Sequence, residues 1–82
     1  MEARSGMIVR SMAGRDKGKF MVVVSTGDGF LYVADGKERK LGSPKKKNPK
    51  HVSFTKTAVN TDNLTDKGLR ALLREFTEGA QD

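Results

Sequence analysis

The sequence predicts a mainly β fold, in which a small antiparallel barrel is followed by a C-terminal α-helix. Two observations support this prediction. Short apolar and β-branched runs alternate with glycine-containing turns over the first two-thirds of the chain, and apolar residues recur at helical spacing near its end. A chain of 82 residues is also too short to build two hydrophobic cores. We therefore expect one domain, with the barrel and a basic loop at residues 1–62 and the helix with a short tail at residues 63–82.

The first half of the barrel is expected to hold one strand and a hairpin. Residues 6–12 combine β-branched and apolar residues, as a short strand does. Residues 19–26 give the clearest strand, because apolar side chains occupy both faces and so predict a central position in the sheet. One face carries Phe20, Val22 and Val24, and the other carries Met21 and Val23. Gly27 and Gly29 favour a tight turn into a third strand at residues 30–34.

The second half of the barrel is expected to add two short strands around an exposed loop. Asp35 and Gly36 indicate a turn, after which residues 37–41 are expected to form the fourth strand. Residues 42–50 contain four lysines, two prolines and no apolar side chain that would anchor them in a core, so we interpret them as a surface loop. Residues 51–55 are expected to close the barrel as the fifth strand. Connections this short favour antiparallel pairing, since parallel strands need long crossovers.

The C-terminal helix is predicted at residues 66–78 by a single apolar stripe. The stripe consists of Leu69, Leu72, Leu73 and Phe76. Thr65 is suited to cap the helix N-terminus, where Asp66 complements the positive end of the helix dipole. Leu64 can pack on Leu69 across this cap. We expect the apolar stripe to pack against the barrel.

The composition disfavours several classes of function. The chain has no cysteine, so disulfides and thiolate metal sites are excluded, and the lone His51 cannot build a metal site or a catalytic triad by itself. The acidic residues nearest the basic region have no nucleophile and base around them, so we expect neither an enzyme nor a cofactor. No run approaches the roughly 20 apolar residues of a membrane span, and the N-terminus lacks the apolar segment of a secretory signal. We expect a cytoplasmic, monomeric protein without a membrane partner.

Positive charge is concentrated in the first part of the chain. The net charge is +6, from 16 Lys and Arg against 10 Asp and Glu. Residues 1–51 hold 12 basic and 5 acidic side chains, a difference of +7, whereas residues 52–82 hold 4 basic and 5 acidic ones, a difference of −1. A segment this basic attracts polyanions, and nucleic acid is the commonest such partner inside cells.

Two groups of residues are the candidates for nucleic-acid contact. The turn between the first two strands combines glycines, which permit close approach, with cations that can meet phosphate: Gly14, Arg15, Lys17, Gly18 and Lys19. The lysine run forms the second group, because phosphates would relieve its internal repulsion: Lys45, Lys46, Lys47, Lys50 and the neighbouring His51. Arg10 on the first strand completes the set. The alternatives are an ordinary hairpin turn and a solvated loop, and His51 alone is more often a packed or capping residue than a ligand.

Two aromatic residues share one face of the third strand. Phe30 and Tyr32 are two positions apart, so their side chains point to the same side. Exposed aromatic rings can stack on unpaired bases, but in a small barrel they mostly fill the core. We expect Phe30 in the core and leave Tyr32 open between the two roles.

The chain resembles a KOW motif over about its first two-thirds. The likeness is carried by Gly-Met-Ile-Val-Arg-Ser at 6–11, Ala-Gly-Arg-Asp-Lys-Gly-Lys at 13–19 and three valines at 22–24, and it extends through Ala-Asp-Gly at 34–36 to Lys-His-Val at 50–52. The chain is similar to bacterial KOW-domain RNA-binding proteins that resemble certain large-subunit ribosomal proteins of archaea and eukaryotes. It departs from the usual pattern at Phe20 and Met21, where many KOW motifs have a second glycine. The resemblance implies an SH3-like barrel of the KOW type, with RNA bound at the loop between the first two strands.

These observations predict an RNA-binding protein that recognises structured RNA through phosphate contacts. The resemblance implies ribosomal RNA as the partner and the ribosome, with its proteins, as the setting. The alternative is a protein-interaction module that docks on a transcription or translation factor, because some KOW domains of transcription factors bind proteins.

Overall fold

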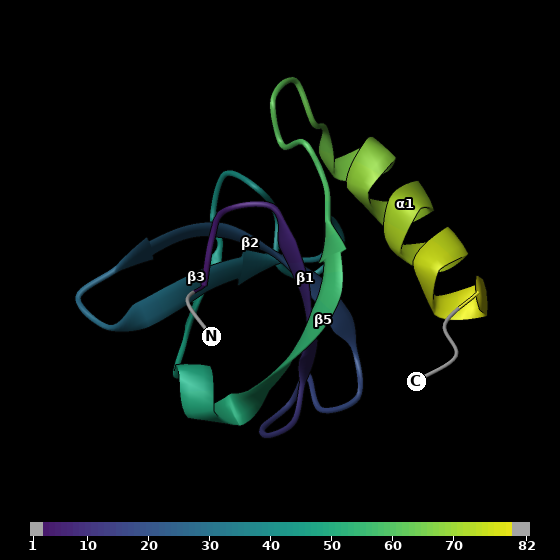
Figure 1. Cartoon of the computed structure of the whole chain (residues 1–82). Coiled ribbons are helices and arrows are strands. Elements are labelled where there is room, and N and C mark those ends of the chain that lie inside the picture. Colours follow the sequence, from purple (N-terminus) through teal and green to yellow (C-terminus); the bar gives the residue numbers. More distant parts are fainter. Residues whose placement is uncertain (1–2, 80–82) are drawn as a thin grey trace.

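The fold is a curved antiparallel sheet with one α-helix packed against it (Figure 1). The computed structural model describes residues 3–79, so the C-terminal tail expected at residues 80–82 lies outside the described residues. The strands are β1 (Met7–Ser11), β2 (Phe20–Gly27), β3 (Phe30–Ala34), β4 (Lys45–Lys47) and β5 (Val52–Ala58). A short 3₁₀-helix, η1 (Pro49–His51), precedes β5, and the α-helix α1 (Asp66–Gly79) follows it. The predicted class, a mainly β chain of the small SH3-like barrel type with a C-terminal helix, is confirmed.

Strand β2 is central in the sheet, as its two apolar faces predict. Within residues 3–79 the sheet order is β4-β3-β2-β1-β5, and every pairing is antiparallel. The alternating side chains of β2 enter two different hydrophobic clusters. The first, the strand cluster, is built by strands alone and contains Val9, Met21, Val23, Leu31 and Val33. The second, the helix-covered face, lies between the sheet and α1 and contains Ile8, Val22, Ala34, Leu69 and Leu73.

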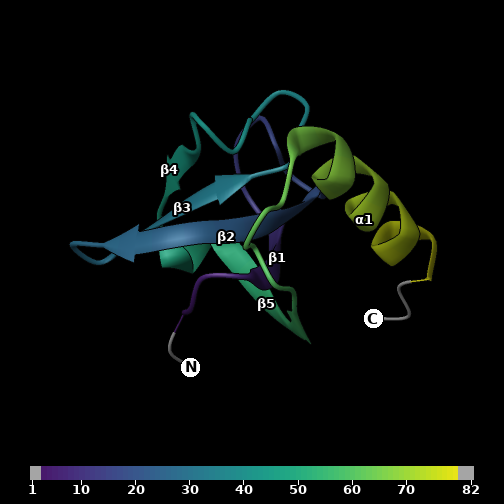
Figure 2. The ribbon, with the colours of Figure 1, turned by 90° about the horizontal axis from the view of Figure 1, so that it is seen from above.

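Helix α1 begins at the predicted cap and buries the predicted stripe. The Thr65 hydroxyl accepts a hydrogen bond from the Gly68 backbone N–H at 3.0 Å, which satisfies one of the free donors at the helix start. Leu69 and Leu73 are buried against the sheet. The Phe76 ring meets the Phe20 ring edge-to-face, with centroids 5.0 Å apart. Figure 2 shows α1 lying along one side of the sheet, and the described residues include no helix with the length and apolar character of a membrane span.

The connection between β3 and β4 is fixed to the first turn of α1. Asp66 accepts a hydrogen bond from the Leu41 backbone N–H at 2.8 Å, and Arg70 donates one to the Gly36 carbonyl at 2.7 Å. Gly36 has a φ of 81°, and a Cβ at this position would collide with the Asp66 carbonyl. Only glycine therefore lets the chain turn this close to the helix.

The structure corrects the predicted boundaries after β3. Residues 37–41 do not form a strand, because the Asp35 side chain accepts hydrogen bonds from the backbone N–H groups of Lys37 and Arg39 and folds the segment into a turn. The fourth strand is β4, within the region interpreted as an exposed loop, and its three lysines pair with β3. The last strand runs to Ala58, three residues beyond the predicted end. Strand pairing uses the backbone, so a run of lysines can form a strand although its side chains give no apolar signal.

Candidate nucleic-acid interface

The two predicted groups of basic residues meet at one end of the barrel. The Met12 backbone N–H donates to the His51 carbonyl at 2.8 Å, and the Lys47 ammonium donates to the Ala13 carbonyl at 2.9 Å. These contacts join the loop between β1 and β2 to the segment from β4 through η1. We call residues 12–19 and 45–51 together the basic end.

The β1–β2 loop is closed by a backbone hydrogen bond and buries one of its side chains, that of Asp16. Gly14 and Gly18 have φ values of 77° and 90°, which favour glycine. The Gly18 backbone N–H donates to the Ser11 carbonyl at 2.7 Å, and this bond closes the loop. Within the loop, Asp16 is buried while its neighbours Arg15 and Lys17 are exposed.

Asp16 is the buried anionic centre of a charge cluster whose two cations are partly exposed. Its carboxylate Oδ2 lies 3.4 Å from the Arg39 Nε and 3.5 Å from the Lys45 Nζ, and its side chain is 0% exposed. The other oxygen, Oδ1, has no hydrogen-bond partner among the described residues. Burial alone raises the pKa of the Asp16 carboxyl, but the charges of Arg39 and Lys45 and their hydrogen bonds outweigh this effect and hold the pKa below its usual value. Asp16 therefore stays ionised and holds two cations at the barrel end.

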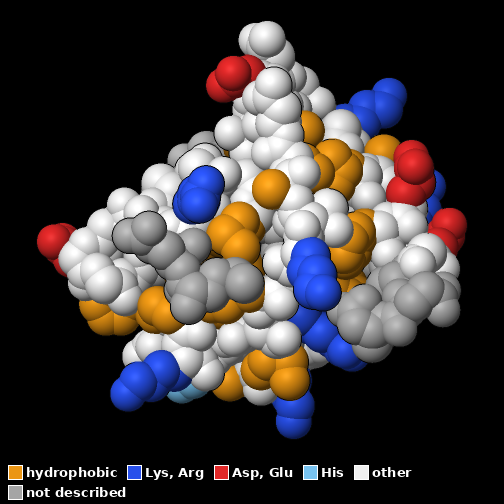
Figure 3. Space-filling model, viewed as in Figure 1, with side chains coloured by type: hydrophobic (Ala, Val, Ile, Leu, Met, Phe, Trp, Pro, Cys, Tyr) orange, Lys and Arg blue, Asp and Glu red, His pale blue; other side chains and the backbone are white. Residues whose placement is uncertain are grey.

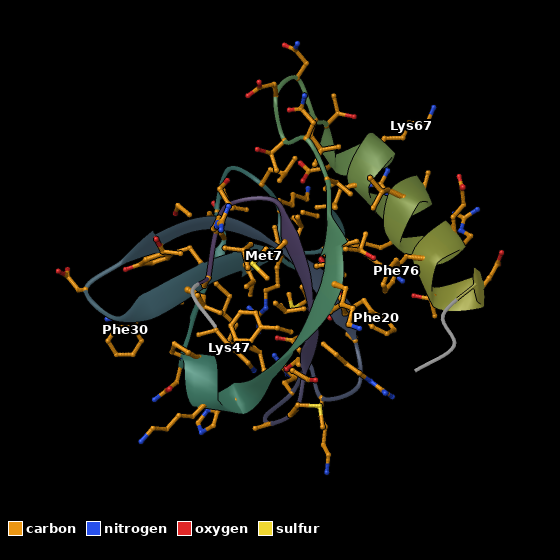
Figure 4. All side chains as sticks on the ribbon, viewed as in Figure 1. Met7, Phe20, Phe30, Lys47, Lys67 and Phe76 are labelled. Carbon is orange, nitrogen blue, oxygen red and sulfur yellow. The ribbon has the colours of Figure 1, made fainter. Side chains whose placement is uncertain are left out.

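Lys47 is directed into the barrel rather than toward solvent (Figure 4). Only 6% of the residue is exposed. Burial lowers the pKa of its ammonium group, as does Lys45, while Asp16 opposes this effect. The prediction that the whole run lies in an exposed loop is wrong for Lys47, because side chains alternate along β4 and place Lys45 and Lys47 on one side and Lys46 on the other.

The remaining predicted residues differ in what else they contact. The exposed ones are Arg10, Gly14, Arg15, Lys17, Gly18, Lys19, Lys46, Lys50 and His51. Lys19 forms an ion pair with Glu38 at 2.7 Å, and this hydrogen bond raises the pKa of Lys19 and lowers that of Glu38. The Arg10 guanidinium lies 5.6 Å from the Phe20 ring centroid, and the Lys46 Nζ lies 4.2 Å from that of Phe30.

The outer surface of the basic end is cationic. In Figure 3 the charged side chains in view along the lower edge of the molecule are Lys, Arg and the histidine. The carboxylates in view lie at the tip of the β2–β3 hairpin, on the loop above and beside α1. Asp16, which is the one carboxylate in residues 12–19 and 45–51, is buried and paired with cations. Apart from Glu38, which pairs with Lys19, this surface presents cations to approaching phosphate oxygens.

Two features of the site were not found from the sequence. Arg39 joins the cluster around Asp16 although it lies 23 positions further along the chain, and only the folded sheet brings the two together. Met12, a residue of the basic end, is 48% exposed. It follows directly after β1, which ends at Ser11, and nothing in the sequence indicates that the strand predicted at residues 6–12 stops before this residue and leaves it facing solvent.

Phe30 is not in the core, contrary to the prediction. Within residues 3–79, both hydrophobic clusters are formed without Phe30 or Tyr32. Leu31 and Val33, the alternate residues of β3, fill the strand cluster instead. Phe30 and Tyr32 are therefore partly exposed on the opposite face.

Comparison of the chain with protein-family models gives no match, and comparison with curated proteins gives none either. Among the described residues, no three His, Cys, Asp or Glu side chains gather in a way that could hold a metal ion.

Proposed function

We propose that the protein binds structured RNA through phosphate contacts at the basic end. The observation that carries the proposal is the common location of Arg15, Lys17 and Lys50, which are exposed on two segments joined by hydrogen bonds. The buried Asp16 supports it, because this carboxylate holds Arg39 and Lys45 at the same end of the barrel without itself facing the solvent. Ribosomal RNA is the partner that the resemblance to KOW proteins favours.

The mode of recognition is electrostatic and depends on shape. Lysine and arginine contacts to phosphate fix the position of a folded RNA but carry little information about base sequence. About five such contacts give a slope of log affinity against log salt of roughly −3 to −5. A closed loop with two glycines suits such contacts, since its backbone can approach the RNA closely.

The first test measures binding of purified large-subunit ribosomal RNA and of a labelled RNA hairpin across a salt series. The variant Arg15→Ala/Lys17→Ala/Lys50→Ala removes three exposed cations of the basic end. Its salt slope is expected to be smaller in magnitude by about 2 to 3, because each phosphate contact contributes about 0.7 to 0.9. The matched control Lys56→Ala/Lys67→Ala/Arg74→Ala removes three exposed cations elsewhere and should keep most of the wild-type slope.

Two results would contradict the proposal. One is absence of RNA binding by the wild type at low salt. The other is an equal loss in both triple variants, which would mean that net charge matters and the basic end does not. Cosedimentation of the protein with ribosomal subunits, repeated across salt, tests the ribosomal setting.

A second candidate function is docking on a protein of the transcription or translation machinery. An open groove between β5 and α1 supports it, with Phe54, Val59, Leu72 and Phe76 among its lining residues. Partners captured from cell extract after nuclease treatment would favour this function. Complete loss of captured partners after nuclease would exclude it as the main activity.

A further inference from the structure

An aromatic pair lies on the outer face of the β2–β3 hairpin, next to the basic end. Phe30, Tyr32 and Ala34 point to the same side of β3, because they are two positions apart. Ala34 is buried in the helix-covered face, but Phe30 and Tyr32 lie further along the hairpin and are partly exposed. In Figure 4, Phe30 lies at the end of the hairpin distant from α1, whereas Phe20 and Phe76 lie together between the sheet and the helix.

Small residues of β2 lie beside these rings. Gly27 of β2 pairs with Phe30, so no side chain stands directly opposite that ring. The Tyr32 ring reaches toward the same glycine, since a Cβ at Gly27 would lie 3.9 Å from Tyr32 Cε2. Ser25, which pairs with Tyr32, is small and exposed. The two rings therefore form an apolar surface with a polar border.

A cation accompanies the rings. Lys46 of β4 pairs with Tyr32 across the sheet, and its Nζ lies 4.2 Å from the centroid of the Phe30 ring. Lys46 is exposed, and β4 leads through Asn48 into η1, which carries Lys50 and His51 of the basic end. Lys46 thus connects the two rings to the segment of the basic end that carries Lys50.

We propose that Phe30 and Tyr32 form a stacking surface for unpaired bases of the bound RNA, with Lys46 contacting the adjacent phosphate. The proposal rests on the proposed RNA binding and adds a preference for RNA in which a single-stranded segment adjoins a folded one. Stacking suits this surface because every base has a π face and aromatic rings need only a flat, open side. Lys46 can adapt to the RNA, since its long, flexible side chain can move off the partly exposed Phe30 ring and contact the phosphate.

The test compares two RNAs that differ in one feature. The first is a blunt-ended hairpin closed by a compact tetraloop whose bases stack on one another, and the second is the same hairpin with a short single-stranded 3′ extension. The wild type is expected to bind the extended RNA more tightly by roughly 5- to 100-fold for each base stacked. The variant Phe30→Leu/Tyr32→Leu keeps apolar side chains but removes both π faces, so it should bind the two RNAs equally while its affinity for the blunt hairpin stays at the wild-type value.

Tyr32 also provides a direct optical signal. It is the one tyrosine of the chain, which has no tryptophan. Stacking on a base is expected to quench its fluorescence with the extended RNA and to leave it nearly unchanged with the blunt hairpin. The variant Tyr32→Phe should keep the preference for the extended RNA, because the ring remains.

The possible outcomes separate this inference from the proposed function. Equal wild-type affinity for both RNAs, without quenching, would overturn the stacking surface and leave phosphate binding at the basic end intact. A preference that survives Phe30→Leu/Tyr32→Leu would overturn it as well. Failure of the wild type to bind either RNA would overturn both proposals.

Discussion

The helix-covered face and the basic end are both reached by β1 and β2, but they are stabilised by different forces. On the helix-covered face, Ile8 and Val22 pack against Leu69 and Leu73, and burial of apolar surface holds the elements together. At the basic end, the enclosed side chains include Asp16 and Lys47, and ion pairs and hydrogen bonds hold the loops. A small barrel can therefore be closed at one end by charged side chains, provided that each buried charged group has an ion-pair or hydrogen-bond partner.

The largest expected effect is on the helix-covered face. Leu69 is 0% exposed between α1 and the sheet, so Leu69→Ala removes buried methyl groups and leaves a cavity. We expect the free energy of unfolding to fall by about 2 to 5 kcal/mol, measured by chemical denaturation. RNA affinity of the folded fraction should stay at the wild-type value. A loss of less than about 0.5 kcal/mol would show that the helix adds little to the core.

The second effect tests the charge cluster. Asp16→Asn keeps the shape of the side chain but leaves the cations Arg39 and Lys45 without their buried anion. Both partners are partly exposed, so we expect a loss of about 1 to 3 kcal/mol rather than the full cost of an isolated buried charge. Unfolding of both proteins in denaturant at neutral pH measures the difference.

The stability difference between wild type and Asp16→Asn is also expected to depend on pH. The pKa of Asp16 lies below its usual value in the folded protein, so its contribution to stability is fully present at pH values well above the usual pKa of an aspartate. As the pH falls through the lowered pKa, the folded protein takes up the proton and the contribution disappears. The stability difference between wild type and Asp16→Asn should therefore shrink in acid. A difference that stays constant from pH 6 to pH 2 would contradict the assigned ion pairs.

The two regions also differ in how far the sequence predicted them. Apolar periodicity predicts the helix and the central position of β2, because the helix-covered face and the strand cluster are made of apolar residues. The cap follows from the position of Thr65 just before the helical stripe. For the basic end, the sequence predicts which residues belong to it but not how they are arranged. Charge alone indicates its residues, but the same run of lysines predicts a loop where β4 forms, since nothing in three consecutive lysines indicates that the middle one is exposed and the last one is buried. Pairing with β3 decides that difference, and pairing is a property of the folded chain.

The third effect compares two lysines of the same run. The Lys47 ammonium is buried and bound to the Ala13 carbonyl, whereas Lys50 is exposed on η1. Lys50→Ala is expected to weaken RNA binding by roughly three- to tenfold at moderate salt. Lys47→Met keeps the buried apolar stem and should change affinity by less than about twofold. Fluorescence anisotropy with one labelled RNA measures both, and a larger loss in Lys47→Met than in Lys50→Ala would reverse the assignment.

The smallest effect concerns the surface ion pair. Glu38 holds the Lys19 ammonium at 2.7 Å, and both side chains are exposed. Glu38→Gln frees this cation and removes a nearby negative charge, so we expect RNA affinity to rise by about twofold at low salt and to match the wild type at high salt. The melting temperature should not change measurably, because exposed ion pairs contribute little. Unchanged affinity at low salt would place Lys19 outside the RNA contact, and weaker binding would contradict the expected gain.

The central claim is that RNA contacts the basic end and not the helix. Titration of the ¹⁵N-labelled protein with an RNA hairpin, followed by amide chemical shifts, tests it most directly. We predict that the perturbed amides cluster in residues 12–19 and 45–51, and that those of α1 from residue 66 onward remain nearly unchanged. Perturbations confined to α1 and β5, or no saturable perturbation at low salt, would contradict the account.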